Sequence, residues 1–598
     1  MLTLACPKWT ALLCASALVV LVLGPANAEA LRPFQVPLEE LSGKSAHAEE
    51  YLTGQGLGLD LNRNLRMDPA NGTDLDKYMA LADPVYEWEF NSSNVIEGSI
   101  PLLGKWKGYL VNMTSLTWLT PEDTGECWTW HNGVLVVVPE SLDTSIDTMM
   151  IWPSDGLDPV RVPSWKPDDR DKNTMLVSTI ALMTRQVVVG LFQIPNAHCT
   201  FPNDPKHESR TEDSLMAFTW RQFLDAHTSG DPNGTAFQWP AQCPMVKATV
   251  RAMDATQEFL SKCESCGVKN VPDHWVVFGA SKRGWVTWLT AAVDKRVVGI
   301  IPVVFDLLNT DKLMHQWWQN YGAWSFALED YFNENIMGFM DTPAWDAFNA
   351  FLDPLMYKDR LTMPKYIVTS GNDEFFQTMD DHAWWDQMPG KNLLLKTPNA
   401  DHVQVTGLTK IIPSIATWMN VINEDRKNNN PASTLPTISW DISYEGSNTE
   451  QVGIITARVN LASPGTTAPN KALMRYAYTL PGTNRIDFRF FTVNENCPIP
   501  QISFPAIYSG ELCPNFDTIW NEVELPAVNQ EDLLVYTAKM KAPESGWMAM
   551  YIQFEFPGKR ELIFLDYPFY ANTQAALVPN DVLPFPPCHG SECSGSLV

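Results

Sequence analysis

The chain has 598 residues, of which 45% are hydrophobic and 11% aromatic, enough apolar material for more than one packed domain and too much for a disordered chain. It carries 42 Lys and Arg against 69 Asp and Glu, a formal net charge of -27. This balance argues against nucleic acid or an anionic membrane as partner, since both require a basic surface, and we interpret the acidity as an aid to solubility.

The first 28 residues have the pattern of a secretory signal peptide. Lys8 precedes the apolar run Ala11–Leu23, and Ala26-Asn27-Ala28 forms a small-x-small cleavage site. An uncleaved anchor is the weaker alternative, because the apolar run is short for a membrane span and no later stretch reaches about 20 apolar residues. We therefore predict a secreted protein without a membrane span. Four sequons predict N-glycosylation, at Asn71, Asn91, Asn112 and Asn233.

Of the 11 cysteines, Cys6 and Cys14 lie in the signal peptide, which leaves nine. Outside the cell some of these should form disulfides, and the odd number leaves at least one thiol free or paired between chains; the pairing cannot be derived from spacing. Cys263-x-x-Cys266 follows a predicted helix without a thioredoxin-like context, so a local bridge or unpaired thiols are expected there instead of a redox dithiol. No second Cys/His pair at ligand spacing accompanies it, and we expect no metal site and no cofactor.

Residues 29–75 are polar and rich in Gly and Asn, which predicts an irregular N-terminal segment. From residue 76 to 425 strands and helices alternate. The predicted elements are strands in Lys107–Leu119, strands Val134–Val138 and Thr148–Trp152, helix Met175–Met183, strand Val187–Phe192, helices Ser214–Ala226 and Val246–Cys263, and strands Trp275–Phe278, Val297–Phe305, Tyr366–Thr369 and Leu393–Leu395. This alternation predicts an α/β fold with a doubly wound, mostly parallel sheet covered by helices on both faces.

An aromatic-rich insertion at 309–363 has helical spacing, which core packing alone explains. Because it follows one strand end and precedes another, it also predicts a helical cap over a pocket. Beyond the linker Arg426–Pro431, alternating strands predict a β-sandwich at 432–575, followed by a flexible tail at 576–598. Its strands are predicted at Gly453–Val459, Ala472–Tyr478, Ile486–Thr492, Leu533–Lys541, Trp547–Phe556 and Leu562–Tyr567.

Ser281 is the candidate nucleophile. The apolar strand Trp275–Phe278 is followed by Gly279-Ala-Ser-Lys-Arg-Gly284 and then by a helical stretch. A serine on such a turn has its hydroxyl lifted above the sheet edge beside free helix amides, an arrangement called a nucleophile elbow. The G-x-S-x-G pattern is imperfect because Arg283 stands at the second glycine position. A serine that merely caps a βα unit is the competing interpretation.

Asp373 and His402 are the candidate partners of Ser281. Each follows a predicted strand at its carboxyl end, the sheet edge at which the Ser281 turn also opens, and the order Ser, Asp, His is that of α/β-hydrolases. We predict that His402 is the base and that Asp373 orients it, with Asp306 and Glu374 as alternative acids. A common Gly-Asn-Asp turn and an Asp-His helix cap are the competing interpretations. His274 precedes the elbow strand, which excludes it as the base.

The backbone N–H of Lys282 is the predicted oxyanion donor, and the loop Pro153–Gly156 should supply a second one. The side chains of Lys282 and Arg283 either bind an anionic substrate or are solvated or paired with acids. Glu329 and Asp330 in the insertion are candidates for meeting a substrate amine, although acidic pairs on a helix usually face solvent.

A set of longer motifs resembles the PhoPQ-activated pathogenicity-related protein family, from about Asp76 to Asn572. The motifs are Trp239-Pro240, Pro244-Met-Val-Lys247, Arg251-Ala-Met-Asp254, Gly279-Ala-Ser-Lys-Arg-Gly-Trp285, Asp294-x-Arg296-Val297, Asp306-x-x-Asn309, Pro364-Lys365, Gly371-x-Asp373-x-Phe375-Phe376 and Pro398-Asn-Ala-Asp-His402. The resemblance implies an α/β-hydrolase-like domain followed by a β-sandwich, and it makes Arg283 a family trait. It implies no substrate, because hydrolase folds also serve non-catalytic proteins.

Two functional hypotheses follow. The first is a secreted serine hydrolase of peptidase or esterase type, with a small-molecule or peptide substrate. The second is a non-catalytic secreted signalling or binding protein that represses cell proliferation through a cell-surface receptor, since the family resembled includes a secreted autocrine proliferation repressor. A metal-dependent hydrolase ranks third, because the sequence contains no HExxH motif or clustered ligand set.

Overall fold

The computed structural model describes residues 51–55, 64–67, 72–155, 171–430, 434–494, 497–498, 500–503, 508–558, 561–562, 565–566 and 568–598. The predicted signal peptide at 1–28, Asn71 and most of the segment 29–75 lie outside these residues. Within that segment β1 (Tyr51–Gln55) pairs antiparallel with β2 (Glu87–Asn91). The prediction of an irregular segment is therefore wrong for β1, because the hydrogen bonds that make it a strand come from a distant part of the chain.

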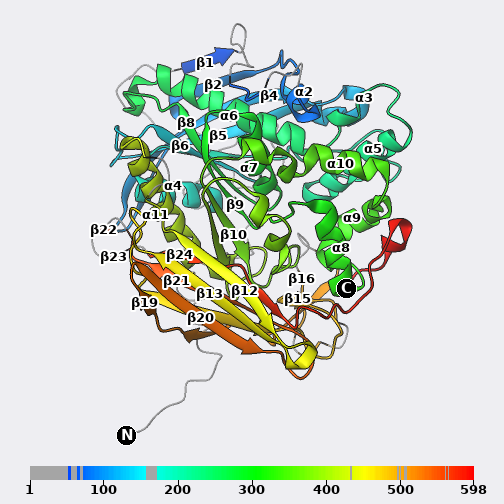
Figure 1. The fold of residues 1–598 in the computed structure, drawn as a ribbon. Helices are drawn as coiled ribbons and strands as arrows, with labels where there is room; N and C mark the ends of the chain where they lie inside the picture. Colours follow the sequence, from blue (N-terminus) through cyan, green and yellow to red (C-terminus); the bar gives the residue numbers. More distant parts are fainter. Residues whose placement is uncertain are drawn as a thin grey trace.

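A large mixed sheet forms the centre of the molecule (Figure 1). Its antiparallel part contains β3 (Val95–Ile100), β4 (Gly104–Thr117) and β5 (Thr129–Pro139). The parallel part contains β6 (Thr148–Pro153), β7 (Val188–Leu191), β8 (His274–Ala280), β9 (Val297–Val303), β10 (Lys365–Ser370) and β11 (Asn392–Thr397). The spatial order is β4-β5-β7-β6-β8-β9-β10-β11, and β7, β6, β8, β9, β10 and β11 pair in parallel. This order confirms the predicted α/β-hydrolase-like fold.

Helices cover both faces of the parallel strands. On one face lie α5 (Glu212–Thr228), α6 (Gln242–Lys262) and α7 (Lys282–Val293), whose core includes Trp275 and Val277 of β8. On the other face lie α4 (Lys172–Thr184) and α11 (Leu408–Lys427), whose core includes Val276 and Phe278. These four residues of β8 are all fully buried, which explains why the strand is a continuous apolar run. Two short helices, α2 (Asp74–Met79) and α3 (Pro121–Thr124), precede β5.

The insertion between β9 and β10 is helical, with α8 (Thr310–Tyr321), α9 (Glu329–Asn333) and α10 (Pro343–Leu352). These helices lie beside α5 in Figure 1. Trp220 of α5 contacts Phe348 and Tyr331, with ring centroids 4.8 and 4.7 Å away. The aromatic residues of the cap therefore form core, and the same helices cover the carboxyl end of the sheet, where ligands bind in this class of fold.

The C-terminal strands form two packed layers. One is a four-stranded sheet of β12 (Ile438–Glu445), β13 (Val452–Asn460), β20 (Leu533–Lys541) and β19 (Val528–Gln530). The other contains β14 (Lys471–Tyr478), β18 (Asn521–Glu524), β21 (Met548–Phe556), β24 (Phe569–Asn572) and β25 (Ala576–Val578). Because β24 pairs with β11, this second layer continues the central sheet. The strands predicted at 432–575 thus share a sheet with the hydrolase part.

Shorter strands complete this region: β15 (Phe491–Thr492), β16 (Ile502–Ser503), β17 (Glu511–Pro514), β22 (Glu561–Leu562) and β23 (Leu565–Asp566). Of the strand predicted at Ile486–Thr492, only the last two residues form one. The preceding side chains Asp487 and Arg489 pair with each other instead, with Nη2 and Oδ2 2.6 Å apart. The ion pair is fully buried, and the backbone N–H groups of Ile486 and Phe490 donate to Asn320 and Asn372, at 3.0 and 3.3 Å, outside any strand pairing.

The predicted flexible tail at 576–598 is packed onto the rest of the protein. β25 pairs with β21, and the backbone of Val598 donates to Trp324 and accepts from Phe326, at 2.8 and 3.0 Å. Arg489 Nη1 also donates to the carbonyl of Val598, at 2.7 Å. The prediction failed because the tail is held by backbone bonds and a distant arginine, which its Gly- and Ser-containing sequence does not indicate.

Four disulfides join described cysteines, Cys127–Cys199, Cys263–Cys266, Cys497–Cys513 and Cys588–Cys593. Cys243 is a free, buried thiol. The local bridge predicted for Cys263 and Cys266 is therefore present, and the odd cysteine is explained.

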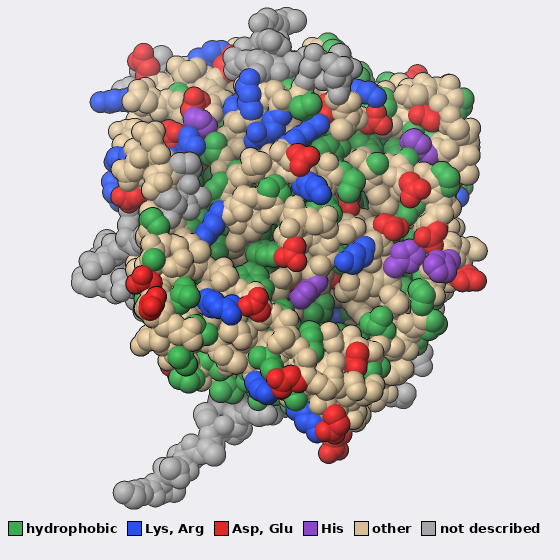
Figure 2. Space-filling view, in the orientation of Figure 1, with side chains coloured by type: hydrophobic (Ala, Val, Ile, Leu, Met, Phe, Trp, Pro, Cys, Tyr) green, Lys and Arg blue, Asp and Glu red, His purple; other side chains and the backbone are tan. Residues whose placement is uncertain are grey.

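On the face of the molecule in Figure 2 the acidic charge is dispersed. On the face drawn in Figure 2, acidic side chains are spread among basic and apolar ones and do not gather in one patch. Among the described helices, none has the length and apolar character needed to cross a membrane.

Candidate active site

Ser281 lies at the sharp turn between β8 and α7. Its backbone angles are φ 57° and ψ -127°, a conformation that costs free energy for a residue with a Cβ and that is stored at functional sites. Its backbone N–H donates to Val303 of β9 and its carbonyl accepts from Trp285, at 2.9 and 3.2 Å, and these bonds hold the strained turn. The geometry is that of a nucleophile elbow.

Two glycines make room for this turn. A Cβ on Gly279 would lie 2.5 Å from the carbonyl oxygen of Arg283, and one on Gly284 would lie 2.7 Å from Cβ of Phe305. The close approach of helix to strand that G-x-S-x-G elbows require is thus supplied by Gly284, one residue after the usual position. Arg283 is tolerated at that position because its side chain leaves the turn toward α5.

The three residues predicted to act together are in contact. His402 Nε2 lies 2.9 Å from Ser281 Oγ, and His402 Nδ1 lies 2.9 and 3.0 Å from the two carboxylate oxygens of Asp373. An ionised carboxylate only accepts, so Nδ1 carries the proton and Nε2 is free to accept from the serine hydroxyl. Asp373 Oδ1 also accepts from the backbone N–H groups of Phe375 and Phe376, at 2.8 and 3.1 Å, which fixes the direction of the carboxylate.

Glu374, one of the alternative acids, has a different position. Its Oε2 accepts from the backbone N–H of His402 at 3.0 Å, so it holds the main chain of the histidine and not its ring. Burial, together with the nearby charges of Asp373 and Asp401, raises the pKa of Glu374 well above its usual value. Sequence spacing alone did not separate this carboxyl from its neighbour.

Asp306, the other alternative acid, is buried behind the site with Asp381 and Lys396. Burial and the charge of Asp381 raise the pKa of Asp306 to about 8, although Lys396 opposes the shift. Lys396 Nζ lies 3.4 Å from Asp381, so one fully buried cation accompanies the carboxyls of Asp306 and Asp381. Since Asp373 occupies Nδ1 of His402 with both oxygens, Asp306 is not the acid that the structure places on the histidine.

The raised pKa of Asp306 predicts a pH-dependent stability. The folded protein holds the proton up to about pH 8 and the unfolded chain releases it near pH 4, so stability falls as pH rises through that window. Asp306→Asn should match wild type at pH 4 and exceed it at pH 8 by more than about 1.4 kcal/mol, the equivalent of one pKa unit. Thermal melting at both pH values measures this, and an equal difference at both would contradict it.

Lys282 and Arg283 pair with acids of α5. Arg283 donates to both carboxylate oxygens of Glu212 at 2.7 and 2.5 Å and to the carbonyl of Ile194 at 2.5 Å. Lys282 Nζ lies 3.0 Å from both Glu212 and Asp213. Burial acts against ionisation of Glu212, but Arg283 and Lys282 outweigh it and hold the pKa of Glu212 well below its usual range. Of the two interpretations of these cations, pairing is the one observed.

Glu212 and Asp213 are the site residues that sequence analysis missed. They lie about 70 positions before the elbow, in a first helical turn where acidic residues are common for the helix dipole alone. Their only sequence signal was that position directly before the predicted helix Ser214–Ala226. Contact with Lys282 places them beside Ser281.

Of the two predicted oxyanion donors, the backbone N–H of Lys282 lies in the first turn of α7, where amides have no acceptor within the helix. In the loop predicted to supply the second donor, the Ser154 N–H already donates to Leu191 at 2.7 Å. Residues 156–170, which include Gly156, lie outside the described part of the chain.

Two cavities meet at Ser281. A small one, of about 60 Å³, lies under the cap among aromatic residues such as Trp285 and Tyr331 and includes Asp213. A much larger one, of about 880 Å³, includes His402 and extends between the sheet and helices α4 and α11. Ser281 therefore borders free space on two sides.

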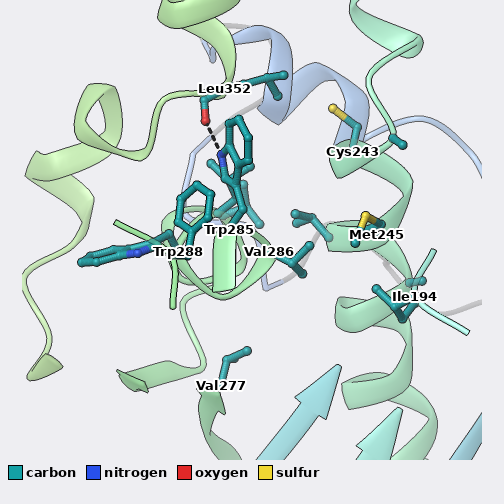
Figure 3. Packing of buried hydrophobic residues seen from close by; sticks show 14 of the residues in the cluster. Ile194, Cys243, Met245, Val277, Trp285, Val286, Trp288 and Leu352 are labelled. Carbon is teal, nitrogen blue, oxygen red and sulfur yellow. Dashed lines mark hydrogen bonds between the residues drawn. The ribbon is translucent and has the colours of Figure 1, made fainter. Parts of the chain in front are cut away.

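The elbow helix is anchored in the core and to the cap. Figure 3 shows Trp285 of α7 donating from its indole to the carbonyl of Leu352 of α10, at 2.7 Å, among buried side chains that include Trp288 and Val286. This bond links the helix that follows Ser281 to the cap that covers the small cavity.

The other candidate residues have mixed positions. Glu329 accepts from the backbone N–H and the hydroxyl of Ser509 at 2.9 and 2.7 Å, so it faces the C-terminal region and not a substrate amine. The sequence did not predict this contact, because the local pattern does not indicate which side of α9 meets that region. Burial, Asp213 and Glu329 raise the pKa of Asp330 to about 6.

Among described residues, two groups could jointly ligate a metal, and both lie on the cap and tail and not at Ser281. They are Asp311, His315 and Asp341, and His315 with the disulfide-bonded Cys588 and Cys593.

The described sequons differ in access. Asn233 is exposed, whereas Asn91 and Asn112 are half-buried. Asn91 caps a turn by accepting from Ser93 at 2.8 Å, and Asn112 lies within β4, paired on both sides. Among these three described sequons, Asn233 is therefore the most accessible for glycosylation.

Comparisons with known proteins support one assignment. Residues 75–471 match the family described as PhoPQ-activated pathogenicity-related protein. The chain is also 32% identical over 523 residues to autocrine proliferation repressor protein A of Dictyostelium discoideum, covering 86% of this chain and 92% of that protein. The chain belongs to the PhoPQ-activated pathogenicity-related protein family.

Solved structures similar to this family member are hydrolases by title. An acetyl xylan esterase from Paenibacillus sp. R4 aligns with a TM-score of 0.32 and 10% identity over 59% of this chain and 96% of that one. Acetyl xylan esterase 1 from Thermoanaerobacterium gives 0.31 and 9% over 55% and 86%, and a Mycobacterium smegmatis proline iminopeptidase gives 0.27 and 13% over 50% and 96%. Because the overall similarity is low, the fold assignment rests on the strand order described above.

Proposed function

We propose that this protein is a secreted serine hydrolase of the peptidase or esterase type, with Ser281, His402 and Asp373 as its catalytic residues. The observation that carries the proposal is the pair of hydrogen bonds made by His402, to Ser281 at 2.9 Å and to Asp373 at 2.9 Å. A strained serine at an elbow supports it, since such strain is retained where it serves a function.

In this mechanism Ser281 Oγ attacks the carbonyl carbon of the substrate while His402 Nε2 takes the hydroxyl proton. Asp373 stabilises the imidazolium that forms, and the N–H of Lys282 donates to the oxyanion. The tetrahedral intermediate breaks its bond to the leaving group, which receives the proton from His402. Water then attacks the acyl-serine by the same route and regenerates the enzyme.

Labelling with a fluorophosphonate tests the activated serine. We expect the purified chain to be labelled covalently, and Ser281→Ala and His402→Ala to lose labelling, because the first lacks the nucleophile and the second its base. Gel fluorescence measures the label, with melting temperatures as the control for folding. Absence of labelling in well-folded wild-type protein would reject the catalytic assignment.

The second candidate function is a secreted signalling protein that represses cell proliferation through a cell-surface receptor. The 32% identity to an autocrine proliferation repressor over most of both chains favours it. The two candidates are compatible on one chain. Adding wild-type and Ser281→Ala protein to proliferating cells separates them: repression by both variants makes the effect independent of catalysis, and repression by wild type alone makes it depend on the serine.

A further inference from the structure

The large cavity beside Ser281 is a channel that leads away from the catalytic edge. Its lining includes Ser281 and His402 at one end and Phe278 of the same strand β8 farther along. Ala280 and Phe278 are two residues apart, so their side chains share one face of the sheet, the face covered by α4 and α11. The channel therefore runs under the elbow between the sheet and these two helices, which lie side by side in Figure 1.

One face of each helix forms a wall. On α11 the lining residues are Leu408, Ile411, Ile412 and Ile415, at positions i, i+3, i+4 and i+7. On α4 they include Lys172, Met175, Leu176 and Thr179, at the same spacing. Apart from Lys172 and Asn173 at the start of α4, and the Thr179 hydroxyl, which donates to the carbonyl of Met175 at 2.6 Å, the side chains on these two walls are apolar.

The polar lining lies at the catalytic end. Asp155 follows β6 at that edge, and its carboxylate is satisfied by Lys172 and Asn173 at the start of α4, at 2.5 and 2.9 Å. Lys282 and Glu212 border the serine itself. Polarity thus falls from Ser281 inward, as in a site that holds a polar reacting group at its mouth and an apolar chain in its depth.

The length of the walls indicates the length of that chain. The seven residue-to-residue steps from Leu408 to Ile415 extend about 10 Å at a rise of 1.5 Å each. An extended hydrocarbon advances about 1.25 Å per carbon–carbon bond, given bonds of about 1.5 Å and angles near 111°. The channel therefore accommodates an aliphatic chain of about eight carbons.

We propose that the channel binds the aliphatic chain of a carboxylic ester whose carbonyl lies at Ser281. This inference rests on the proposed function and selects the esterase over the peptidase alternative. A peptide in the channel would place N–H and C=O groups against Ile411, Ile415 and Leu176, where they find no hydrogen-bond partner, and that burial is costly. A hydrocarbon chain has no such groups and gains free energy from burial.

A chain-length series on the full-length protein tests the channel. We expect kcat/KM for 4-nitrophenyl octanoate to exceed that for 4-nitrophenyl acetate by about 100-fold, less than the roughly thousand-fold or more that six fully buried methylenes would give. Octyl acetate serves as the second arm, because it carries the same chain on the alcohol side. A preference for 4-nitrophenyl octanoate assigns the chain to the acyl group, and a preference for octyl acetate over ethyl acetate assigns it to the alcohol.

Variants that fill the channel provide the structural control. Leu176→Trp and Ile412→Trp, both at half-buried positions, should lower octanoate turnover by at least about tenfold while acetate turnover stays within about twofold. Thr409→Trp adds the same side chain on the exposed face of α11 and should change the turnover of neither substrate by more than about twofold. Retained acetate turnover shows that the variants fold.

The outcomes separate the two proposals. Equal rates for 4-nitrophenyl acetate and octanoate, together with equal rates for ethyl and octyl acetate and with turnover lost in Ser281→Ala, would overturn the channel and leave the hydrolase standing. If no ester is turned over, calorimetry with sodium octanoate decides: binding that Leu176→Trp abolishes and Thr409→Trp retains would support the channel without the catalysis, and no binding would overturn it.

Discussion

Asp373→Asn should lower kcat for any hydrolysed substrate by about 10⁴-fold without unfolding the protein. The backbone N–H groups of Phe375 and Phe376 would hold the amide oxygen of the new side chain, at the place where Oδ1 lies now. Its NH2 group would then point at His402 Nδ1 and donate to it, so Nε2 would carry the proton. A histidine in that tautomer cannot accept the proton of Ser281. The rate of fluorophosphonate labelling measures the effect when no substrate is known.

The matched control is Asp306→Asn. Asp306 groups with Asp381 and Lys396 and does not bond to the imidazole, whereas Glu374 accepts from the main chain of His402 and is left unchanged. We expect Asp306→Asn to keep the labelling rate within about tenfold of wild type. A larger loss in Asp306→Asn than in Asp373→Asn would transfer the orienting role to Asp306 and contradict the assignment.

Arg283→Met should destabilise the protein by about 2–3 kcal/mol, at or below the lower end of the range for breaking a buried ion pair. The side chain of Arg283 is 9% exposed and makes three short hydrogen bonds, to Glu212 and to Ile194. Its loss leaves the Glu212 carboxylate with Lys282 alone and the Ile194 carbonyl without this donor. We choose the low end because Glu212 is 36% exposed and water screens the charge that remains. Denaturant unfolding measures the change.

A double-mutant cycle isolates the pair. Arg283→Met with Glu212→Gln should recover more than 1 kcal/mol of the single-variant loss, because no uncompensated charge is then buried. The exposed pair Arg458–Asp441 is the control, and Arg458→Met should cost no more than about 1 kcal/mol. Because the pKa of Glu212 is lowered in the folded protein, the stabilisation by this pair depends on pH. It is present above the unfolded pKa of about 4.3 and disappears as pH falls below it. Equal losses in the free energy of unfolding for Arg283→Met and Arg458→Met would contradict a special stabilising role for the Arg283–Glu212 pair.

Most of the hydrolase fold could be predicted from local sequence. The strand β8 was predictable because a fully buried parallel strand needs apolar side chains on both faces, and α6 because its apolar residues recur at helical spacing. The positions of Ser281, Asp373 and His402 followed from the rule that the carboxyl ends of parallel strands share an edge. These inferences depend only on short stretches of sequence and on the order of the strands along the chain.

Contacts between distant segments were decided only by the tertiary structure. The pairing of Arg283 with Glu212, the addition of β24 to β11 and the binding of Val598 to Trp324 join residues that are at least 71 positions apart. Backbone hydrogen bonds and ion pairs of this kind depend on position in space and leave no local pattern. The choice between Asp373 and its neighbour Glu374 is of the same type, since the two carboxyls are adjacent in sequence and only the direction of each side chain determines which reaches the imidazole.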